Sequence, residues 1–167
     1  MTGTGVLVIA TDGSCLGNPG AGGWAWAVTP QVWGAGGAVH TTNNAMELQA
    51  IRQALLFAPA GAPLVVETDS AYSISCLSNW ITGWKRNGWR TKAGGEVKNV
   101  ELIRGIDELL ALREVSFRKV KGHSGDLLNE VCDLRARDAA AAVRAGRPVA
   151  IGVSAGRSRV TSRGPDT

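Results

Sequence analysis

The order of strand-like and helix-like segments limits the fold of this chain more than any other feature. Three short segments with strand composition come first, and they are followed by a helix, a strand, further helices, a strand and a long last helix. Early strands followed by alternating strands and helices favour one sheet of mixed strand direction with helices packed on it. The sequence therefore predicts an α/β fold.

The predicted strands are 6–10, 24–28, 33–39, 64–66 and 115–120. The first is a short apolar run followed by Asp12 and Gly13, a pair typical of turns, so we expect the strand to end there. The third crosses a glycine-rich stretch at 34–37, which counts against strand formation.

The predicted helices begin at Asn44 and cover 70–80, 99–112 and 127–143. Asn44 is suited to cap the first of these helices, because its side chain can accept from a backbone N–H of the first turn. Glu47 stands three residues later, and Leu48, Ile51 and Leu55 follow at helical spacing. This pattern predicts an amphipathic helix.

The chain of 167 residues, 44% of them apolar, is long enough for one packed domain, which we place at 1–145. From Gly146 onward large apolar residues are scarce, and a disordered basic tail at 146–167 is expected. The tail is hypothesised to add non-specific nucleic-acid affinity; its arginines include Arg147, Arg157, Arg159 and Arg163. The alternative is a solvating end without a partner.

The sequence has no apolar run of the ~18–20 residues that a membrane helix needs, and no secretory signal is recognisable. Cys15, Cys76 and Cys132 do not have the spacing of a zinc site, so they are expected to be reduced thiols. We therefore expect a cytoplasmic monomer that has no membrane partner.

Four acidic residues stand where strands end or helices lie: Asp12, Glu47, Asp69 and Asp133. In open α/β sheets, catalytic and ligand-binding residues usually lie at the ends of the strands. Carboxylates crowded together repel one another, and divalent cations relieve that repulsion. An oxygen-only ligand set favours Mg²⁺ or Mn²⁺ over zinc. The four acids are therefore candidate metal ligands.

Each acid also has a purely structural interpretation. Asp12 can accept hydrogen bonds in a turn. Glu47 can complete a capping box with Asn44, and either Asp69 or Ser70 can cap the following helix.

Asp133 can belong to a solvated helix stripe with Asn129 and Arg137, at positions i, i+4 and i+8. Spacing and composition leave these alternatives open.

Seven motifs follow one another along the chain: Thr11-Asp12-Gly13-Ser14-Cys15-Leu16-Gly17-Asn18-Pro19-Gly20, Thr41-Thr42-Asn43-Asn44-Ala45-Met46-Glu47-Leu48, Thr68-Asp69-Ser70-Ala71-Tyr72, Trp89-Arg90-Thr91, Val97-Lys98-Asn99-Val100, Val120-Lys121-Gly122-His123-Ser124-Gly125 and Asn129-Glu130-Val131-Cys132-Asp133. With these motifs the chain resembles the bacterial ribonucleases H of the type-one family. They extend over most of the chain in the family's order, which makes a chance match of the whole set very improbable.

The resemblance implies a ribonuclease H-like fold, in which a five-stranded mixed sheet with antiparallel first three strands is flanked by helices. It implies a metal-dependent endonuclease that cuts the RNA strand of RNA/DNA hybrids and leaves 5′-phosphate and 3′-hydroxyl ends. The metal ligands would be Asp12, Glu47, Asp69 and Asp133, holding two Mg²⁺ ions that Mn²⁺ can replace. His123, the fifth catalytic residue, would assist proton transfer or product release; otherwise it is a surface loop residue.

The resemblance also implies a set of substrate contacts. Cys15 and Asn18 would meet the RNA strand near its 2′-hydroxyls, and Thr42 and Asn43 would bind a phosphate of the DNA strand. Segment 80–98 matches the family's basic protrusion, whose expected contact residues are Trp80, Lys85, Arg86, Arg90 and Lys98.

Some of these residues have a structural alternative. Asn43 is also suited to cap a helix, and Trp84 and Trp89 are expected to fix the angle between two helices rather than to stack on substrate.

The chain departs from the usual family pattern at His40, Ala71 and Ile103 and in the approach to the last helix, 125–128. None of these positions is a predicted metal ligand, so the departures bear on substrate affinity. Three other functions share features of the sequence: a transposase- or integrase-like nuclease, a hybrid-binding module without catalysis, and a small cytosolic metal-binding domain without a nucleic-acid substrate. The length of 167 residues counts against the first, because it leaves no room for a DNA-targeting domain.

Overall fold

The computed structural model describes residues 5–121 and 126–152 and contains one five-stranded sheet of order β3-β2-β1-β4-β5. The strands are β1 (Leu7–Leu16), β2 (Gly20–Thr29), β3 (Val32–Thr41), β4 (Leu64–Thr68) and β5 (Val115–Lys119). β1, β2 and β3 pair antiparallel, whereas β4 runs parallel to β1 and β5 parallel to β4. The predicted mixed sheet is confirmed.

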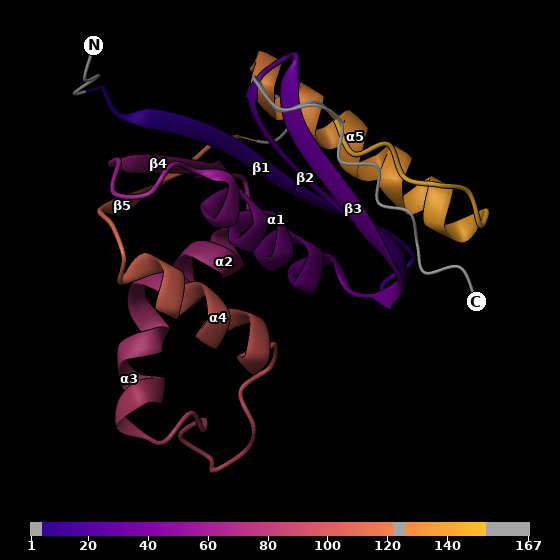
Figure 1. The fold of residues 1–167 in the computed structure, drawn as a ribbon. Coiled ribbons are helices and arrows are strands. Elements are labelled where there is room, and N and C mark those ends of the chain that lie inside the picture. The colour runs from indigo at the N-terminus through magenta and orange to yellow at the C-terminus, as the bar shows by residue number, and fades with distance from the viewer. Residues whose placement is uncertain (1–4, 122–125, 153–167) are drawn as a thin grey trace, which may run out of the picture.

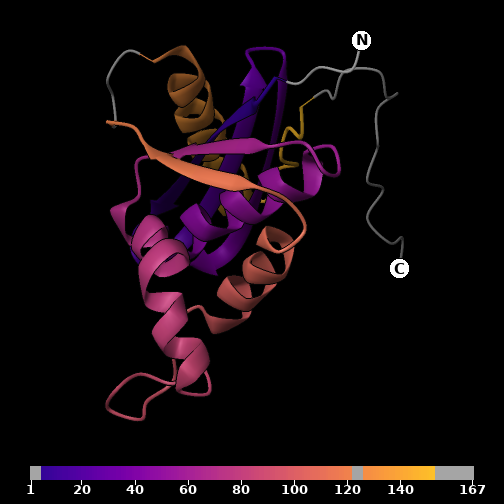
Figure 2. The same cartoon turned by 90° about the vertical axis from the view of Figure 1, so that its left-hand side faces the viewer.

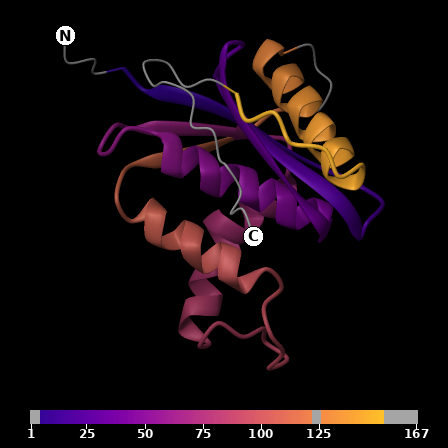
Figure 3. The ribbon, with the colours of Figure 1, turned by 45° about the vertical axis from the view of Figure 1, so that its right-hand side comes forward.

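Helices cover both faces of the sheet (Figure 1). They are α1 (Asn43–Phe57), α2 (Ala71–Ser75), the π-helical turn η1 (Cys76–Trp80), α3 (Ile81–Arg86), α4 (Val100–Leu110) and α5 (Leu127–Arg144). α5 lies over β1, β2 and β3 on one face, and α1 packs on the other, with α2, α3 and α4 beyond it (Figures 1 and 3). No helix in the described residues is long and apolar enough to cross a membrane.

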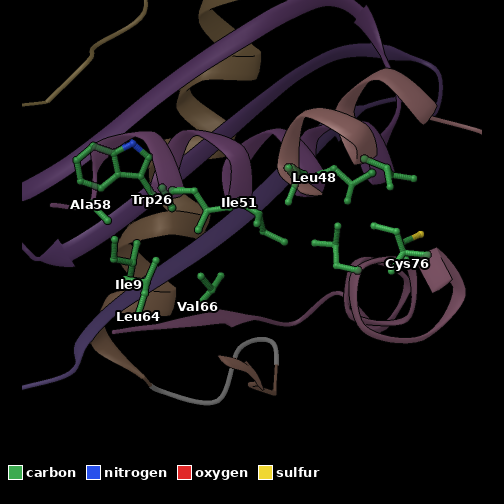
Figure 4. Packing of buried hydrophobic residues seen from close by; sticks show 14 of the residues in the cluster. Ile9, Trp26, Leu48, Ile51, Ala58, Leu64, Val66 and Cys76 are labelled. Atoms are coloured by element: carbon green, nitrogen blue, oxygen red, sulfur yellow. The ribbon is translucent and has the colours of Figure 1, made fainter. Parts of the chain in front are cut away.

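The larger core fills the space between the sheet and α1 (Figure 4). Ile9 and Val66 of the sheet meet Leu48 and Ile51 of α1 there, and all four side chains are fully buried. Burying an aliphatic side chain of this size contributes roughly 1.5–3 kcal/mol. This core therefore fixes α1, and with it Glu47, against β1 and β4.

The smaller core lies under α5 and consists mainly of small residues. Ala10 and Ala25 of the sheet face Ala136 and Ala139 of the helix. Gly23 lets the two layers approach, because a Cβ at this position would lie 2.1 Å from the Ala136 carbonyl oxygen. The alanine-rich sequence of α5 is thus the surface that packs on β1–β3.

The predicted end of the first strand was wrong. Asp12 and Gly13 form no turn: β1 continues to Leu16, because its backbone stays paired with β2 as far as Ala21. β3 also runs straight through its glycines. A Cβ at Gly34 or Gly36 would overlap a tryptophan ring of β2, so these glycines make room for the indoles.

The caps of two helices differ from the simplest prediction. Thr42 caps α1, its Oγ1 accepting from the Ala45 N–H at 3.2 Å, whereas Asn44 already lies inside the helix. The predicted Asn44 cap was therefore wrong. Ser70 caps α2, its Oγ accepting from the Ser73 N–H at 3.1 Å, which leaves Asp69 free of that role.

The predicted helix 70–80 also continues further than expected, through η1 and α3 to Arg86.

The packed part of the chain extends a little beyond the predicted boundary at 145. The Arg147 N–H donates to the Ala142 carbonyl at 2.8 Å, and Val149 packs against the cluster under α5. Residues 153–167 lie outside the described residues, so a disordered tail there remains a prediction.

Replacing Gly23 with Ala is expected to lower the free energy of unfolding by about 1–3 kcal/mol, because the added methyl group meets α5 backbone. The matched control is Gly83→Ala in exposed α3, where nothing lies within 4 Å of the added Cβ. That control should be neutral or stabilising by roughly 0.5–1 kcal/mol. Urea unfolding midpoints measure both changes, and equal midpoints for the two variants would contradict the packing described.

Candidate metal-binding active site

Three of the four predicted acids meet in one place. Asp12 comes from the middle of β1, Glu47 from α1, and Asp69 from the residue directly after β4. One carboxylate oxygen from each lies within 4.8 Å of the other two. Asp12 and Glu47 are only 6% and 4% exposed, whereas Asp69 is half-buried. Three such groups at this separation repel strongly when ionised.

The approach of β1 to α1 at Gly13 brings two of these acids together. A Cβ on Gly13 would lie 2.4 Å from the Glu47 backbone nitrogen, so any side chain there would push α1 away. Asp69 joins them because β4 is the parallel neighbour of β1, and its carboxyl end meets β1 beside Asp12. The convergence is therefore a product of the sheet order.

Asp133 approaches the same centre from α5. It lines a pocket of about 210 Å³ together with Asp12, Glu47 and Asp69; Gly13, Asn43 and Asn129 complete the lining. Its Oδ2 also lies 2.8 Å from Arg137 Nη2, the i, i+4 ion pair that the structural interpretation expected. Asp133 thus faces both the acid pocket and a cation of its own helix.

Burial is the main cause of the raised pKa of Asp12, the acid at the centre of the pocket. Burial and, to a smaller extent, the charges of Asp69 and Asp133 together raise the pKa of Asp12 to about 7, against the hydrogen bonds with Glu47 and with the Gly13 N–H. Burial and the neighbouring Asp12 and Asp69 likewise raise the pKa of Glu47 well above its ordinary value. The pocket is electrostatically unfavourable to its own ionised residues.

The donor set suits a hard divalent cation. Glu47 Oε2 is buried and has no hydrogen-bond partner among the residues that the structure describes. Only carboxylate oxygens form the three-residue group, and such ligands favour Mg²⁺ or Mn²⁺ over zinc. A bound cation would give the buried oxygen a partner and offset the repulsion.

A second pocket, of about 420 Å³, brings together three predicted substrate residues: Asn18, Thr42 and Lys98. Its remaining lining residues are Asn44, Tyr72 and Asn99. Asn18 Oδ1 accepts from the Asn43 N–H at 3.2 Å, which ties the β1–β2 turn to the start of α1. Asn43 itself lines the acid pocket.

Tyr72 and Asn99 of this second pocket were not among the predicted site residues, although both belong to motifs singled out in the sequence. Asn99 adopts a left-handed conformation with φ 59°, and its Nδ2 donates to the Tyr72 hydroxyl at 3.1 Å. This contact orients two polar groups toward the cavity that Lys98 lines. Asparagine adopts this conformation more readily than most residues, but the contact with Tyr72 joins residues 27 positions apart, so local sequence does not specify it.

The thiol of Cys15 is held by the turn after β1. Its Sγ donates to the Gly17 carbonyl at 2.7 Å and is also close to the carbonyls of Gly20 and Thr41. The side chain therefore helps to shape this turn from within, and it remains partly exposed.

The basic segment contains a third pocket, of about 550 Å³, whose lining includes Trp80, Trp84, Arg90 and Lys92. Trp80 is 48% exposed, whereas Trp84 and Trp89 pack partly buried against the larger core. That packing agrees with the helix-spacing role expected for the last two tryptophans.

The cations of this segment have different surroundings. Lys85 Nζ lies 2.8 Å from Asp107 Oδ2 and so links α3 to α4, and Arg90 donates to the Gly94 carbonyl. Arg86 is exposed. The predicted catalytic His123 lies outside the described residues.

The fold and its oxygen-only acidic pocket define a class of metal-dependent enzyme with a ribonuclease H-like sheet. The RNase H family model matches residues 4–141 of the chain. The Ribonuclease H of Pseudoalteromonas atlantica is 45% identical over 137 residues, which is 80% of this chain and 90% of the relative. The chain belongs to the ribonuclease H family and is a ribonuclease H enzyme.

Further comparisons agree with this assignment. The Ribonuclease HI of Streptomyces coelicolor is 45% identical over 152 residues, 87% of this chain, but the match spans only 65% of that longer protein. The crystal structure of LC9-RNase H1, a type 1 RNase H with the type 2 active-site motif, aligns with a TM-score of 0.71 at 26% identity and covers 91% of this chain and 79% of that one.

A foamy viral protease-reverse transcriptase in complex with an RNA/DNA hybrid shares the fold at 19% identity, with a TM-score of 0.65 over 80% of this chain and 20% of that one.

Asp12 is expected to make the metal-free protein less stable as pH rises from about 4 to about 7. Its folded pKa of about 7 exceeds the ordinary 3.8, so in this range the folded state retains a proton that the unfolded state has lost. Asp12→Asn removes the charge, and in chelator it should melt several degrees above the parent at pH 8 and above it by clearly less at pH 5.

Calorimetric melting of both proteins at both pH values measures how the difference between their melting temperatures changes with pH. Identical pH dependence in the two proteins would show that Asp12 is not perturbed.

Proposed function

We propose that the chain is an endonuclease that hydrolyses the RNA strand of RNA/DNA hybrids by two-metal-ion catalysis. One observation carries the proposal: carboxylate oxygens of Asp12, Glu47 and Asp69 lie within 4.8 Å of one another. Asp133 reaches the same pocket from α5. A pocket that concentrates buried negative charge on oxygen atoms suits cation-assisted phosphodiester chemistry.

Asp12, Glu47, Asp69 and Asp133 would hold two Mg²⁺ ions, with Mn²⁺ as a substitute. When bound, the ions would supply an attacking hydroxide and stabilise the leaving 3′ oxygen, so that the products carry 5′-phosphate and 3′-hydroxyl ends. The Gly13 N–H donates to Asp12 Oδ1 at 3.0 Å and so orients this carboxylate. His123 is proposed to assist proton transfer or product release.

Two different strands must be recognised, because only RNA carries 2′-hydroxyls. Cys15 and Asn18 are proposed to meet the RNA strand. Thr42, Asn43 and Lys98 are proposed to bind a DNA-strand phosphate; Lys98 gives the pocket that it shares with Thr42 a positive charge.

Trp80, Lys85, Arg86 and Arg90 are proposed to follow the DNA strand along the basic segment. Lys85 would have to exchange its ion pair with Asp107 for a phosphate. We also propose that the protein acts as a cytoplasmic monomer.

The function is tested with end-labelled RNA/DNA, RNA/RNA and DNA/DNA duplexes of one sequence, each with Mg²⁺ and with chelator. We expect cutting only in the RNA of the hybrid, and only with metal. End analysis should give 5′-phosphate and 3′-hydroxyl termini. A hybrid that is bound but never cut, under Mg²⁺ or Mn²⁺, would favour the binding-module alternative instead.

Asp69→Asn is expected to abolish cleavage and to leave the fold intact, because the residue is half-buried and lies after the last paired residue of β4. The matched control is Asp138→Asn, on the exposed side of α5. Initial cleavage rates and far-ultraviolet circular dichroism are measured for both. Near-parental turnover of Asp69→Asn would remove Asp69 from the ligand set.

A further inference from the structure

An ion pair outside the acid pocket joins β4 to the edge strand β5. Arg118 places both Nε and Nη2 at 3.3 Å from the same oxygen, Oε2 of Glu67. The Glu67 side chain is 8% exposed, whereas that of Arg118 is 58% exposed. A buried carboxylate therefore holds a guanidinium that faces solvent.

The strand register places this pair on the same face of the sheet as Asp12. Ala10 packs under α5, and Asp12, two residues later on β1, points to the same face. Glu67 is the register partner of Ala10, and Arg118 is the register partner of Glu67. Side chains of directly paired residues share a face, so Arg118 lies on the α5 face.

The pair also lies close to Asp69 of the acid pocket. Asp69 is two residues beyond Glu67, about 6.6 Å along the strand, and β5 is displaced from β4 by about 4.8 Å. The Cα atoms of Arg118 and Asp69 are therefore roughly 8 Å apart, within reach of a long side chain. β5 forms the outer edge of the sheet on this side (Figure 2).

Stability alone is a weak reason for this arrangement. An ion pair with one exposed partner contributes little to stability, and apolar residues at such a site are often equally stabilising. The ion pair does orient the guanidinium group of Arg118, because two of its three nitrogens contact Glu67. Nη1 of Arg118 has no hydrogen-bond partner within 5–121 and 126–152.

We propose that Arg118 binds a phosphate of the RNA strand within two nucleotides of the cleavage site. The proposal rests on the proposed function, since the acid pocket is where the RNA would be cut. Guanidinium groups with free N–H donors are well suited to phosphate oxygens.

The choice of strand follows from the two faces of the sheet. The pocket proposed for the DNA strand is lined by residues at the starts of α1 and α4, on the α1 face, and Arg118 lies on the other. A phosphate beside Arg118 would therefore belong to the nucleic-acid strand that passes over the acid pocket, which is the RNA strand.

The test measures binding of hybrids in the Asp69→Asn background, in which the substrate should stay intact. Arg118→Gln is compared with Arg144→Gln, an exposed arginine of the last turn of α5, 11 residues or about 16 Å beyond Asp133. A series of hybrids carries one neutral methylphosphonate at each RNA position within three nucleotides of the cut.

We expect Arg118→Gln to weaken binding roughly 3- to 10-fold and to lower the salt slope by about 1, with a smaller effect for Arg144→Gln. A methylphosphonate at one position within two nucleotides of the cut should weaken hybrid binding by the Asp69→Asn parent. The same substitution should leave binding by the Arg118→Gln variant unchanged. Equal losses for the two arginine variants, or no such position, would overturn the proposal.

The double variant Glu67→Gln/Arg118→Gln separates a phosphate contact from the cost of leaving Glu67 unpaired. If the double variant binds the hybrid as weakly as Arg118→Gln, the phosphate contact is supported. If it binds as tightly as the parent, the contact is rejected. Failure of the proposed function gives a different result, namely no cutting of any hybrid by the unsubstituted protein.

Discussion

The mutual repulsion of buried carboxylates is the interaction on which the rest of this structure depends. Asp12 and Glu47 are almost completely buried beside Asp69, and the pKa of Asp12 is raised to about 7 as a result. Holding these groups together costs free energy that the surrounding packing must offset. The larger core behind α1 and the close approach at Gly13 provide that framework. The protein is thereby less stable than it would be without these charges, but it holds a site that can bind cations.

The sheet separates the two tasks of a hybrid-cutting enzyme. On the α1 face, the pocket of Thr42 and Lys98 is proposed to take the DNA strand. On the α5 face, Asp133 completes the acid pocket, and Arg118 is held beside it by Glu67. Because β1 and β4 are neighbours with parallel direction, both sets of residues border the same strand ends. If these proposals hold, the order of the β-strands determines which nucleic-acid strand of a hybrid meets the acidic residues.

Much of the fold could be predicted from the sequence, since local patterns carry the order of strands and helices. The four acids were predicted as a set only through the family resemblance, because spacing and composition left a structural interpretation open for each. Tertiary contacts decided the rest. Asp12-Gly13 has turn composition but stays in a strand, because β2 pairs with it. The hydrogen bond between Asn99 and Tyr72 in the second pocket joins residues 27 positions apart, so local sequence does not specify it. The ion pair of Arg118 depends on the β4–β5 register, which composition does not encode.

The most direct test is a calorimetric titration of the protein with Mg²⁺ at pH 7, in two buffers of different ionisation enthalpy. If the buried carboxylates form a cation site, Mg²⁺ should bind saturably and release protons from Asp12, whose pKa lies near that pH. Proton release should decline at pH 8.5, where this carboxyl is already ionised. Saturable Mg²⁺ binding that is unchanged by Asp12→Asn, or its complete absence in a protein that cuts hybrids, would contradict the assignment.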